Sequence, residues 1–304
     1  MLTVILGIFS GCLPTVQTAA NSRLRRRTGS PFSSAFISFV IGVCFLLLLL
    51  LCSGQFSGFT LSVTAGQPWW IWLGGALGVV YITGNILLMP RLGSVQTVIL
   101  PVLGQVLMGL AIDHFGWFGS PVTPISALRA AGAVLVLGGV LIITLARLGG
   151  QKREKAAAEW LWRLFGVGIG MLITCQTAIN GRLGSILGSA LRSALISFSV
   201  GALCLLVILC ITRPKLPPRE EGVRAPWWMW IGGILGAASV FFSAYLSPRL
   251  GTGLVMILGQ VGGMTAGLLI DHFGLMDTPV RKISWQKLVG LLCMLLGSSF
   301  IRLF

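Results

Sequence analysis

Two carboxylates in this sequence could take part in proton transfer, because each is followed directly by a histidine. Asp113-His114 and Asp271-His272 lie in the same phrase, Ile-Asp-His-Phe-Gly, at the C-terminal end of an apolar segment. Histidine changes its charge near neutral pH, so an adjacent acid and histidine can exchange protons. A negative charge at a helix C-terminus also opposes the helix dipole, so something must offset it, such as an arginine partner or the capping of a neighbouring helix. We therefore hold two hypotheses for these four residues: proton coupling and a structural lock.

Amide side chains inside apolar segments form a second candidate site. Gln17 and Asn21 are four residues apart, and Gln176 and Asn180 repeat that spacing, so each pair lies on one face of a helix. Amides in lipid need partners, which places them at a helix interface or in a wet cavity. They either line a cavity that offers donors and acceptors to a polar substrate, or they hold helices together. The candidate cavity residues are Gln17, Asn21, Gln105, Gln176, Asn180 and Gln260.

Gln105 and Gln260 do not occupy matching positions in the sequence. Gln105 lies eight residues before Asp113, whereas Gln260 lies eleven residues before Asp271. In a helix, a shift of three residues turns a side chain roughly 60° away from its former face. We therefore do not expect these two glutamines to be equivalent.

Small residues predict where helices approach one another closely. Gly7 and Gly11 form a GxxxG spacing, and Gly166 and Gly170 form another. Such spacings let helix backbones come together in a membrane. We predict close helix packing at these glycines, at a contact where the first helices of the two halves described below could meet.

The sequence contains no set of residues suited to catalysis or to metal binding. The seven cysteines lie in or beside apolar stretches without ligand spacing, which is typical of small buried side chains. Neither paired carboxylates nor a Ser/His/Asp set accompanies the two histidines. We predict no catalytic residues, no metal and no cofactor, and we do not expect an enzyme.

The composition predicts an all-α, polytopic membrane protein. Hydrophobic residues make up 55% of the chain and charged residues only 10%, and the mean hydropathy is +0.94. Residues 28–90 contain no charged side chain, and segments this apolar must satisfy their backbone groups internally, as helices do. The net charge of +15 comes from short basic runs between apolar segments. Such runs meet membrane lipid, so we do not expect nucleic acid as a partner.

An internal duplication organises these segments. Phrases such as Gln-Thr-Ala-x-Asn, Pro-Trp-Trp-x-Trp-x-Gly-Gly and Pro-Arg-Leu-Gly occur twice, in the same order, about 159 residues apart. We predict a first repeat over residues 1–150, a cytoplasmic linker over 151–162 and a second repeat over 163–304. The ten predicted spans are residues 3–21, 33–52, 69–89, 93–112, 129–146, 163–181, 191–212, 227–247, 251–270 and 285–303.

Five spans per repeat is an odd number, so the second repeat must cross the membrane upside down relative to the first. Most of the 22 Lys and Arg residues follow the odd-numbered spans up to the ninth, and the positive-inside rule makes that side cytoplasmic. Both termini are then extracytoplasmic. The pair Gln17 and Asn21 would lie near the cytoplasmic end of its span and the pair Gln176 and Asn180 near the outer end, which suits opposing gates.

Inverted repeats are typical of secondary transporters, in which two similar halves exchange conformations around a site between them. We therefore expect a transporter of a small metabolite or amphipathic compound, working by alternating access. The single chain already contains both orientations, so a monomer of fused repeats would suffice, with membrane lipid as its other partner. A lipid flippase or a small channel shares this architecture and stays an alternative, and a membrane-embedded enzyme is a weaker one.

The repeated phrases resemble the YdcZ-type family of the drug/metabolite transporter superfamily. The opening pattern is carried by Gly11, Pro14, Gln17, Asn21, Leu24, Gly29-Ser30-Pro31, Ser38-Phe39 and Gly42. The fourth-span pattern is carried by Gly104-Gln105 and Asp113-His114-Phe115-Gly116. The resemblance covers essentially the whole chain, once per half. It implies an exporter in a bacterial inner membrane and supplies no substrate.

Overall fold

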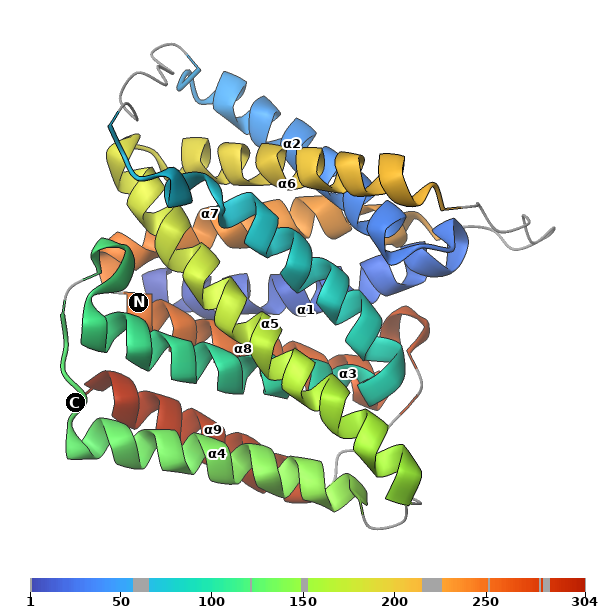
Figure 1. Cartoon of the computed structure of the whole chain (residues 1–304), viewed down its shortest axis with the longest axis vertical. Coiled ribbons are helices and arrows are strands. Elements are labelled where there is room, and N and C mark those ends of the chain that lie inside the picture. Colours follow the sequence, from blue (N-terminus) through green and yellow to red (C-terminus); the bar gives the residue numbers. More distant parts are fainter. Residues whose placement is uncertain are drawn as a thin grey trace.

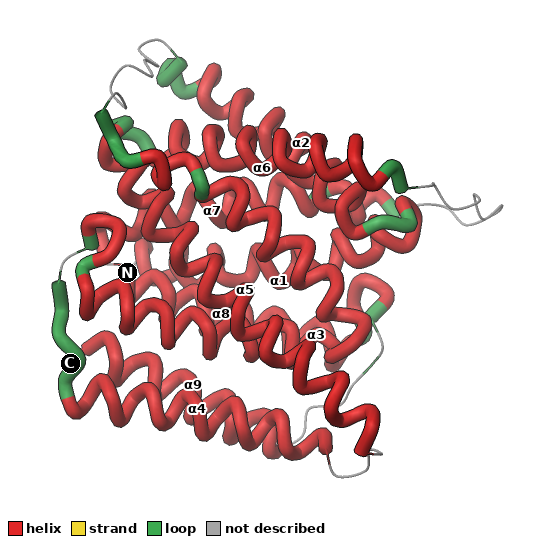
Figure 2. Tube along the Cα trace, viewed as in Figure 1, coloured by secondary structure: helices red, strands yellow, loops and turns green. Residues whose placement is uncertain are grey.

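A computed structural model of the chain is all-helical, as predicted, with helices joined by loops and no strand among the residues that it describes (Figure 2). Those residues are 2–56, 66–120, 122–148, 153–214, 226–250, 252–278, 280 and 285–303. The helices are α1 (Leu2–Thr28), α2 (Pro31–Cys52), α3 (Gly74–Phe115), α4 (Ala127–Leu148), α5 (Arg153–Ile186), α6 (Ala190–Thr212), α7 (Gly232–Leu250), α8 (Thr252–Phe273) and α9 (Trp285–Leu303). Short 3₁₀ turns are η2 (Trp69–Trp72), η3 (Trp117–Gly119), η4 (Trp227–Trp230) and η5 (Leu275–Asp277).

The starts and ends of corresponding helices use the same local chemistry in both halves. Ser30 caps α2 by accepting a hydrogen bond from the backbone of Ser33, and Ser189 caps α6 in the same way. Gly116 and Gly274 end α3 and α8 in the left-handed conformation, with φ of 66° and 62°. The duplicated sequence therefore fixes duplicated helix boundaries.

Helix α3 folds back on itself. It contains 42 residues and would be about 63 Å long if it were straight. Its ends nevertheless meet, because Trp70 just before α3 packs edge-on against Phe118 just after it, with ring centroids 5.3 Å apart. Figure 1 shows the reversal between the teal first part and the green last part. We call these parts α3a (Gly74–Leu92) and α3b (Ile99–Phe115).

Ten apolar helical segments therefore correspond to the ten predicted spans. By length and composition, five of the described segments are long enough to cross a membrane: Leu2–Thr28, Pro31–Cys52, Gly74–Leu92, Glu159–Ile186 and Ala190–Thr212. The other five are apolar but shorter in their described parts, so the count of ten spans stays a prediction. Helix α5 begins at Arg153, which makes most of the predicted linker helical.

The most extensive helix contacts join one half to the other. Helix α1 packs on α8 and α7, α5 packs on α3, α2 packs on α6, and α4 packs on α9. In Figure 1 the α4–α9 pair lies along one side, the α2–α6 pair along the opposite side, and the remaining helices between them. Both larger clusters of buried apolar side chains draw on both halves, as Phe39 and Phe198 illustrate in one of them. The two repeats therefore share their core.

The four GxxxG glycines pack closely, but their partner differs from the one expected. A Cβ added at Gly11 would overlap the carbonyl oxygen of Gly259 in α8, and one added at Gly170 would overlap that of Pro101 in α3. Gly7 and Gly166 likewise face leucines of α8 and α3. The expectation that α1 and α5 meet each other was wrong. At these glycines, each helix packs against the fourth predicted span of the opposite half.

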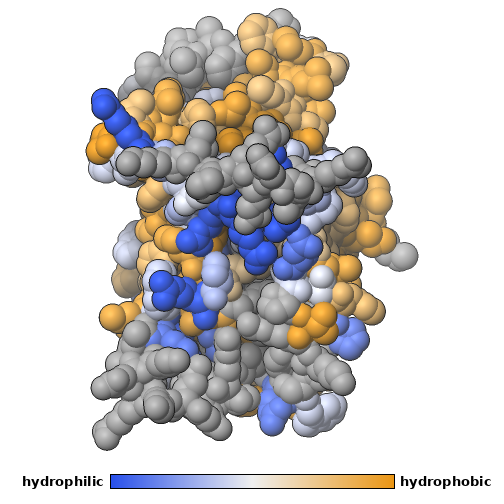
Figure 3. All heavy atoms as spheres, turned by 90° about the vertical axis from the view of Figure 1, so that its right-hand side faces the viewer, coloured by the Kyte–Doolittle hydropathy of each residue, from blue (hydrophilic) through white to orange (hydrophobic). Residues whose placement is uncertain are grey.

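Basic side chains gather at one end of α1. Arg23, Arg25, Arg26 and Arg27 occupy its last turns. Figure 3 shows a hydrophilic patch on the face at the right of Figure 1, where α1 ends, beneath a more apolar region. Such a patch suits contact with the headgroups of a membrane whose interior the apolar helices cross.

Candidate functional site: a polar cavity between the halves

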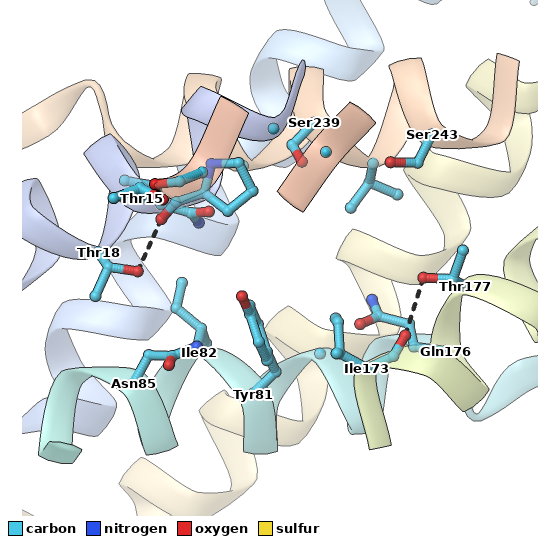
Figure 4. A pocket seen from close by; sticks show the side chains of 18 of the residues that line it. Thr15, Thr18, Tyr81, Ile82, Asn85, Ile173, Gln176, Thr177, Ser239 and Ser243 are labelled. Atoms are coloured by element: carbon cyan, nitrogen blue, oxygen red, sulfur yellow. Dashed lines mark hydrogen bonds between the residues drawn. The ribbon is translucent and has the colours of Figure 1, made fainter. Parts of the chain in front are cut away.

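A cavity of about 210 Å³ lies between the two halves of the chain. Its walls come from α1, α3, α5, α7 and α8, together with one phenylalanine each from α2 and α6. Figure 4 shows the side chains of α3 facing those of α7 across the open centre. Five of the six candidate cavity residues line it, namely Gln17, Gln105, Gln176, Asn180 and Gln260. Their role in binding stays a prediction.

Two glutamines at matching positions meet glycines of the opposite half. Gln17 lies against Gly236 in α7, and Gln176 lies against Gly78 in α3a. A Cβ at Gly78 would lie only 2.7 Å from Nε2 of Gln176, so a larger residue there would displace the amide. Both glutamines are at least nine-tenths buried. The pairing holds an amide from each half at the cavity wall.

The asparagines one turn further along connect the helices of each half. Asn21 donates from Nδ2 to the hydroxyl of Ser38 at 3.3 Å, and Asn180 donates to Ser197 at 3.2 Å. The backbone oxygen of each asparagine accepts from a further serine of the same half at 2.7 Å. Asn21 is completely buried and does not line the cavity. These bonds fit the helix-bridging interpretation for Asn21, while Asn180 both bridges helices and borders the cavity.

Two aromatic rings cover one side of the cavity. Phe39 of α2 and Phe198 of α6 occupy matching positions and stack with ring centroids 4.8 Å apart and planes inclined by 30°. Gly42 and Gly201 make room for them, since a Cβ at Gly42 would lie 2.5 Å from the Phe198 ring. The rings give the polar cavity an apolar surface shared equally by the halves.

The facing walls of α3a and α7 differ in the residues that they present. Tyr81 and Asn85 project from α3a, and Ser239 and Ser243 occupy the corresponding positions on α7 (Figure 4). A phenol and an amide on one wall therefore face two small hydroxyls on the other. Sequence reasoning did not single out Asn85 or the serines, because it searched for residues that recur. Polar residues four apart on one helix face were the available signal.

Gln105 and Gln260 both reach the cavity although they do not match by position. Gln105 projects from α3b, and its counterpart in α8 is Gly263; Gln260 projects from α8, and its counterpart is Val102. All four residues line the same cavity. The two glutamines are therefore not equivalent, as predicted. At each of the two positions, only one half of the chain has an amide.

Gln17 and Gln176 line one cavity, whereas we expected them at opposite gates. The reason lies in the lengths of their helices. The first predicted span ended at Asn21, but α1 continues through its basic turns to Thr28. Helix α5 likewise continues to Ile186. Each glutamine therefore lies well inside its helix, at the depth of the cavity.

Asp113 has a cationic partner at the end of α3. Arg129 in α4 contacts its carboxylate at 2.7 Å, and the arginine side chain is only 3% exposed. The same guanidinium donates to the backbone oxygen of Ile301 in α9 at 3.0 Å and to that of Thr123 at 2.8 Å. The charge that opposes the helix dipole is thereby compensated. This arrangement favours the structural-lock hypothesis for Asp113, which lies outside the cavity.

Of the histidines beside these acids, His272 is exposed and His114 is half-buried. His114 accepts a hydrogen bond at Nδ1 from the backbone of Ile125, at 3.4 Å. His272 packs edge-on against Phe273, as His114 does against Phe115. The side chain of Asp271 lies outside the described residues. Within the described part of the chain, no three His, Cys, Asp or Glu side chains are grouped to hold a metal.

Known proteins resemble this chain once per repeat in sequence and over its whole length in fold. The family model described as "Putative inner membrane exporter, YdcZ" matches residues 2–142 and residues 161–300. The inner membrane protein YdcZ of Escherichia coli (strain K12) is 23% identical over 141 residues, which are 46% of this chain and 94% of that protein. A crystal structure 16% identical in sequence covers 99% of this chain and 96% of its own, with a TM-score of 0.65. That last likeness shows the fold alone.

Proposed function

The chain belongs to the YdcZ family of membrane transporters, and on that premise we propose that it is a secondary transporter that exports a small molecule by alternating access. The two family matches cover the two halves separately, as expected for a fused pair of five-helix repeats. In this proposal the repeats are inverted in the inner membrane, both termini are extracytoplasmic, and one chain is the working unit.

The observation that carries the proposal is the cavity shared by the halves. Its wall contains Gln17 and Gln176, one from each repeat, and each amide meets a glycine of the opposite half. A pseudo-symmetric site between two repeats is where an inverted-repeat carrier holds its substrate. When the halves exchange conformations, the same residues would face first one side of the membrane and then the other.

The pseudo-symmetric contacts also support an exchange of conformations. Gly75 of α3a meets the backbone of Ser197 in α6, and Gly233 of α7 meets that of Ser38 in α2. A motion that loosens one contact and tightens its copy leaves the number of close contacts unchanged. Two such states differ little in energy, which is what a carrier needs in order to reach both.

Cysteine accessibility tests the proposal without knowledge of the substrate. All native cysteines are replaced by alanine or serine, and Thr18→Cys and Thr177→Cys are introduced at the cavity wall. A membrane-impermeant maleimide is then applied to right-side-out and inverted vesicles. We expect each site to react from both sides. A bifunctional reagent that joins one further cysteine introduced on α2 to one introduced on α6, applied before the maleimide, should abolish labelling from one side only.

Ser53→Cys, exposed at the end of α2, is the matched control and should react from one side. Labelling of the cavity from both sides at once, unaffected by the cross-link, would indicate a channel. Protection of the cavity by phospholipid headgroups, but not by water-soluble solutes, would indicate a flippase. A cavity that reacts from one side under every condition would contradict alternating access.

A further inference from the structure

None of the described residues that line the cavity carries a charge. Its polar side chains are amides, hydroxyls and one phenol, and its remaining side chains are apolar. A charged solute that left water for this site would need a counter-charge or a dense set of hydrogen bonds to replace its hydration. The carboxylate of Asp113 is paired with Arg129 and does not line the cavity. The wall chemistry therefore selects against ions of either sign.

One amide of the cavity has hydrogen-bonding capacity that the protein leaves unused. Oε1 of Gln176 is buried and has no hydrogen-bond partner within the described part of the chain, whereas the amide of Asn85 forms a hydrogen bond with the phenol of Tyr81. Gln176 is 4% exposed and lines the cavity, and its amide oxygen is an acceptor. A solute that satisfies this oxygen must donate a hydrogen bond.

The cavity limits the size of such a solute. Its volume of about 210 Å³ is below the roughly 300–1,000 Å³ that is typical of pockets for drug-sized ligands. Phe39 and Phe198 provide an apolar surface for the part of the solute that does not form hydrogen bonds. Tyr81 takes up space on one wall, whereas its counterpart Ser239 leaves space on the other. The polar contacts and the free space thus lie on different walls.

We propose that the cavity takes a small, uncharged, amphipathic solute whose hydrogen-bond donor group, such as the NH₂ of a primary amide, is read by Gln176. The first half supplies Tyr81 and Asn85 as the residues that determine specificity, and the α7 serines leave room for the apolar body. This inference rests on the proposed function for the cavity as a substrate site. Recognition is therefore one-sided even though the fold is pseudo-symmetric.

Three molecules of nearly equal size and different charge test the inference: benzamide, benzoate and benzamidine. The reporter is Ser243→Cys in the cysteine-free, full-length chain in lipid nanodiscs, and the measurement is the rate of its reaction with N-ethylmaleimide. A bound solute slows this rate by the factor 1 + [L]/Kd, about threefold at twice the Kd. We expect protection by benzamide and none by benzoate or benzamidine. Equal or better protection by either ion, or no protection by benzamide at millimolar concentration, overturns the inference.

Variants on the two walls test the one-sided recognition. Tyr81→Ser should weaken protection by benzamide about tenfold, because it removes a hydroxyl and an aromatic face, and it should admit the larger 2-naphthamide. Ser239→Ala is the matched control and should change protection by less than about threefold. If Tyr81→Ser does not fold, Tyr81→Phe, which preserves the packing, replaces it as the test of the hydroxyl. Equal effects on both walls contradict the inference. Binding is measured here without transport, so failure of alternating access would appear only in the two-sided labelling.

Discussion

The two ends of the helix bundle carry the same arginine in different surroundings. At one end, Arg23 of α1 forms an ion pair with Asp277 of η5 at 3.1 Å. At the other, the corresponding Arg182 of α5 lies beside Gly119 of η3, the counterpart of Asp277, where an added Cβ would be 3.6 Å from the arginine side chain. Within the described residues Arg182 has no ion-pair partner. The two equivalent contacts between the halves therefore differ: the one between Arg23 and Asp277 is an ion pair, and the one between Arg182 and Gly119 is not.

The backbone around this difference is the same. Asp277 has a φ of 60° and Gly119 a φ of 74°, and the preceding residues, Met276 and Phe118, both have a φ of 58°. The turn is therefore copied while its charge is not. The comparison teaches that close packing keeps the halves alike where backbones touch, whereas side chains at the ends and on the cavity walls are free to differ. Such differences can favour one of the two conformations.

The largest expected effect comes from the lock at the end of α3. Arg129→Met should destabilise the protein by about 3–5 kcal/mol, because it removes the ion pair of the buried arginine with Asp113 and its hydrogen bonds to two backbone oxygens. The measurement is thermal unfolding in detergent. Asp113→Asn should cost clearly less, since an amide oxygen still accepts from the guanidinium. The second half has Lys287 at the position of Arg129. Equal losses of stability for Arg129→Met and Asp113→Asn would contradict the structural lock.

An intermediate effect is expected at the glycines that bring backbones together. Gly11→Ala and Gly170→Ala should each cost about 1–3 kcal/mol, because the added methyl overlaps a carbonyl oxygen of the opposite half. The two losses should agree, since the contacts are copies. Gly168→Ala is the control, because nothing lies within 4 Å of a Cβ there, and it should be neutral or slightly stabilising in thermal unfolding.

The smallest effect is expected at the ends of the bundle. The Arg23–Asp277 pair is exposed, so Asp277→Gly should shift the balance between conformations by about 0.4 kcal/mol, or about twofold. Gly119→Asp should shift it in the opposite direction by a similar factor, and Asp277 shows that aspartate fits this left-handed position. The ratio of maleimide labelling of Thr18→Cys from the two sides reports the balance. If Asp277→Gly and Gly119→Asp shifted the balance in the same direction, the contacts at the two ends would not favour opposite conformations.

The sequence predicted the helices well because lipid leaves few alternatives. Apolar windows located all ten apolar helical segments, and the repeat located their copies. The beginning of α5 was missed, since Glu154, Lys155 and Glu159 suggested a polar linker. These residues are good helix formers, so the helix extends through them to Arg153. Hydropathy detects where a helix is apolar, not where it starts.

The candidate site was only half predictable. Gln17 and Gln176 were found because they recur in a repeated phrase, and both line the cavity. Asn85 was missed because its copy is Ser243, so the repeat gives no signal there. The role of Gly78 as the neighbour of Gln176 depends on which helices interleave. That arrangement is a property of the folded pair of halves and has no local signature.

The interleaving of the halves has a consequence for biosynthesis. Helix α1 packs on α7 and α8, which emerge from the ribosome more than two hundred residues later. At about 5–20 residues per second, α1 waits on the order of ten to forty seconds for its neighbours. During that interval Gly7 and Gly11, and the amides of Gln17 and Asn21 that are buried in the folded protein, face lipid or the insertion machinery. A nascent chain that stalls after the first repeat is therefore an expected substrate for membrane proteases. Insertion chaperones would have to protect the early helices until their partner helices are made.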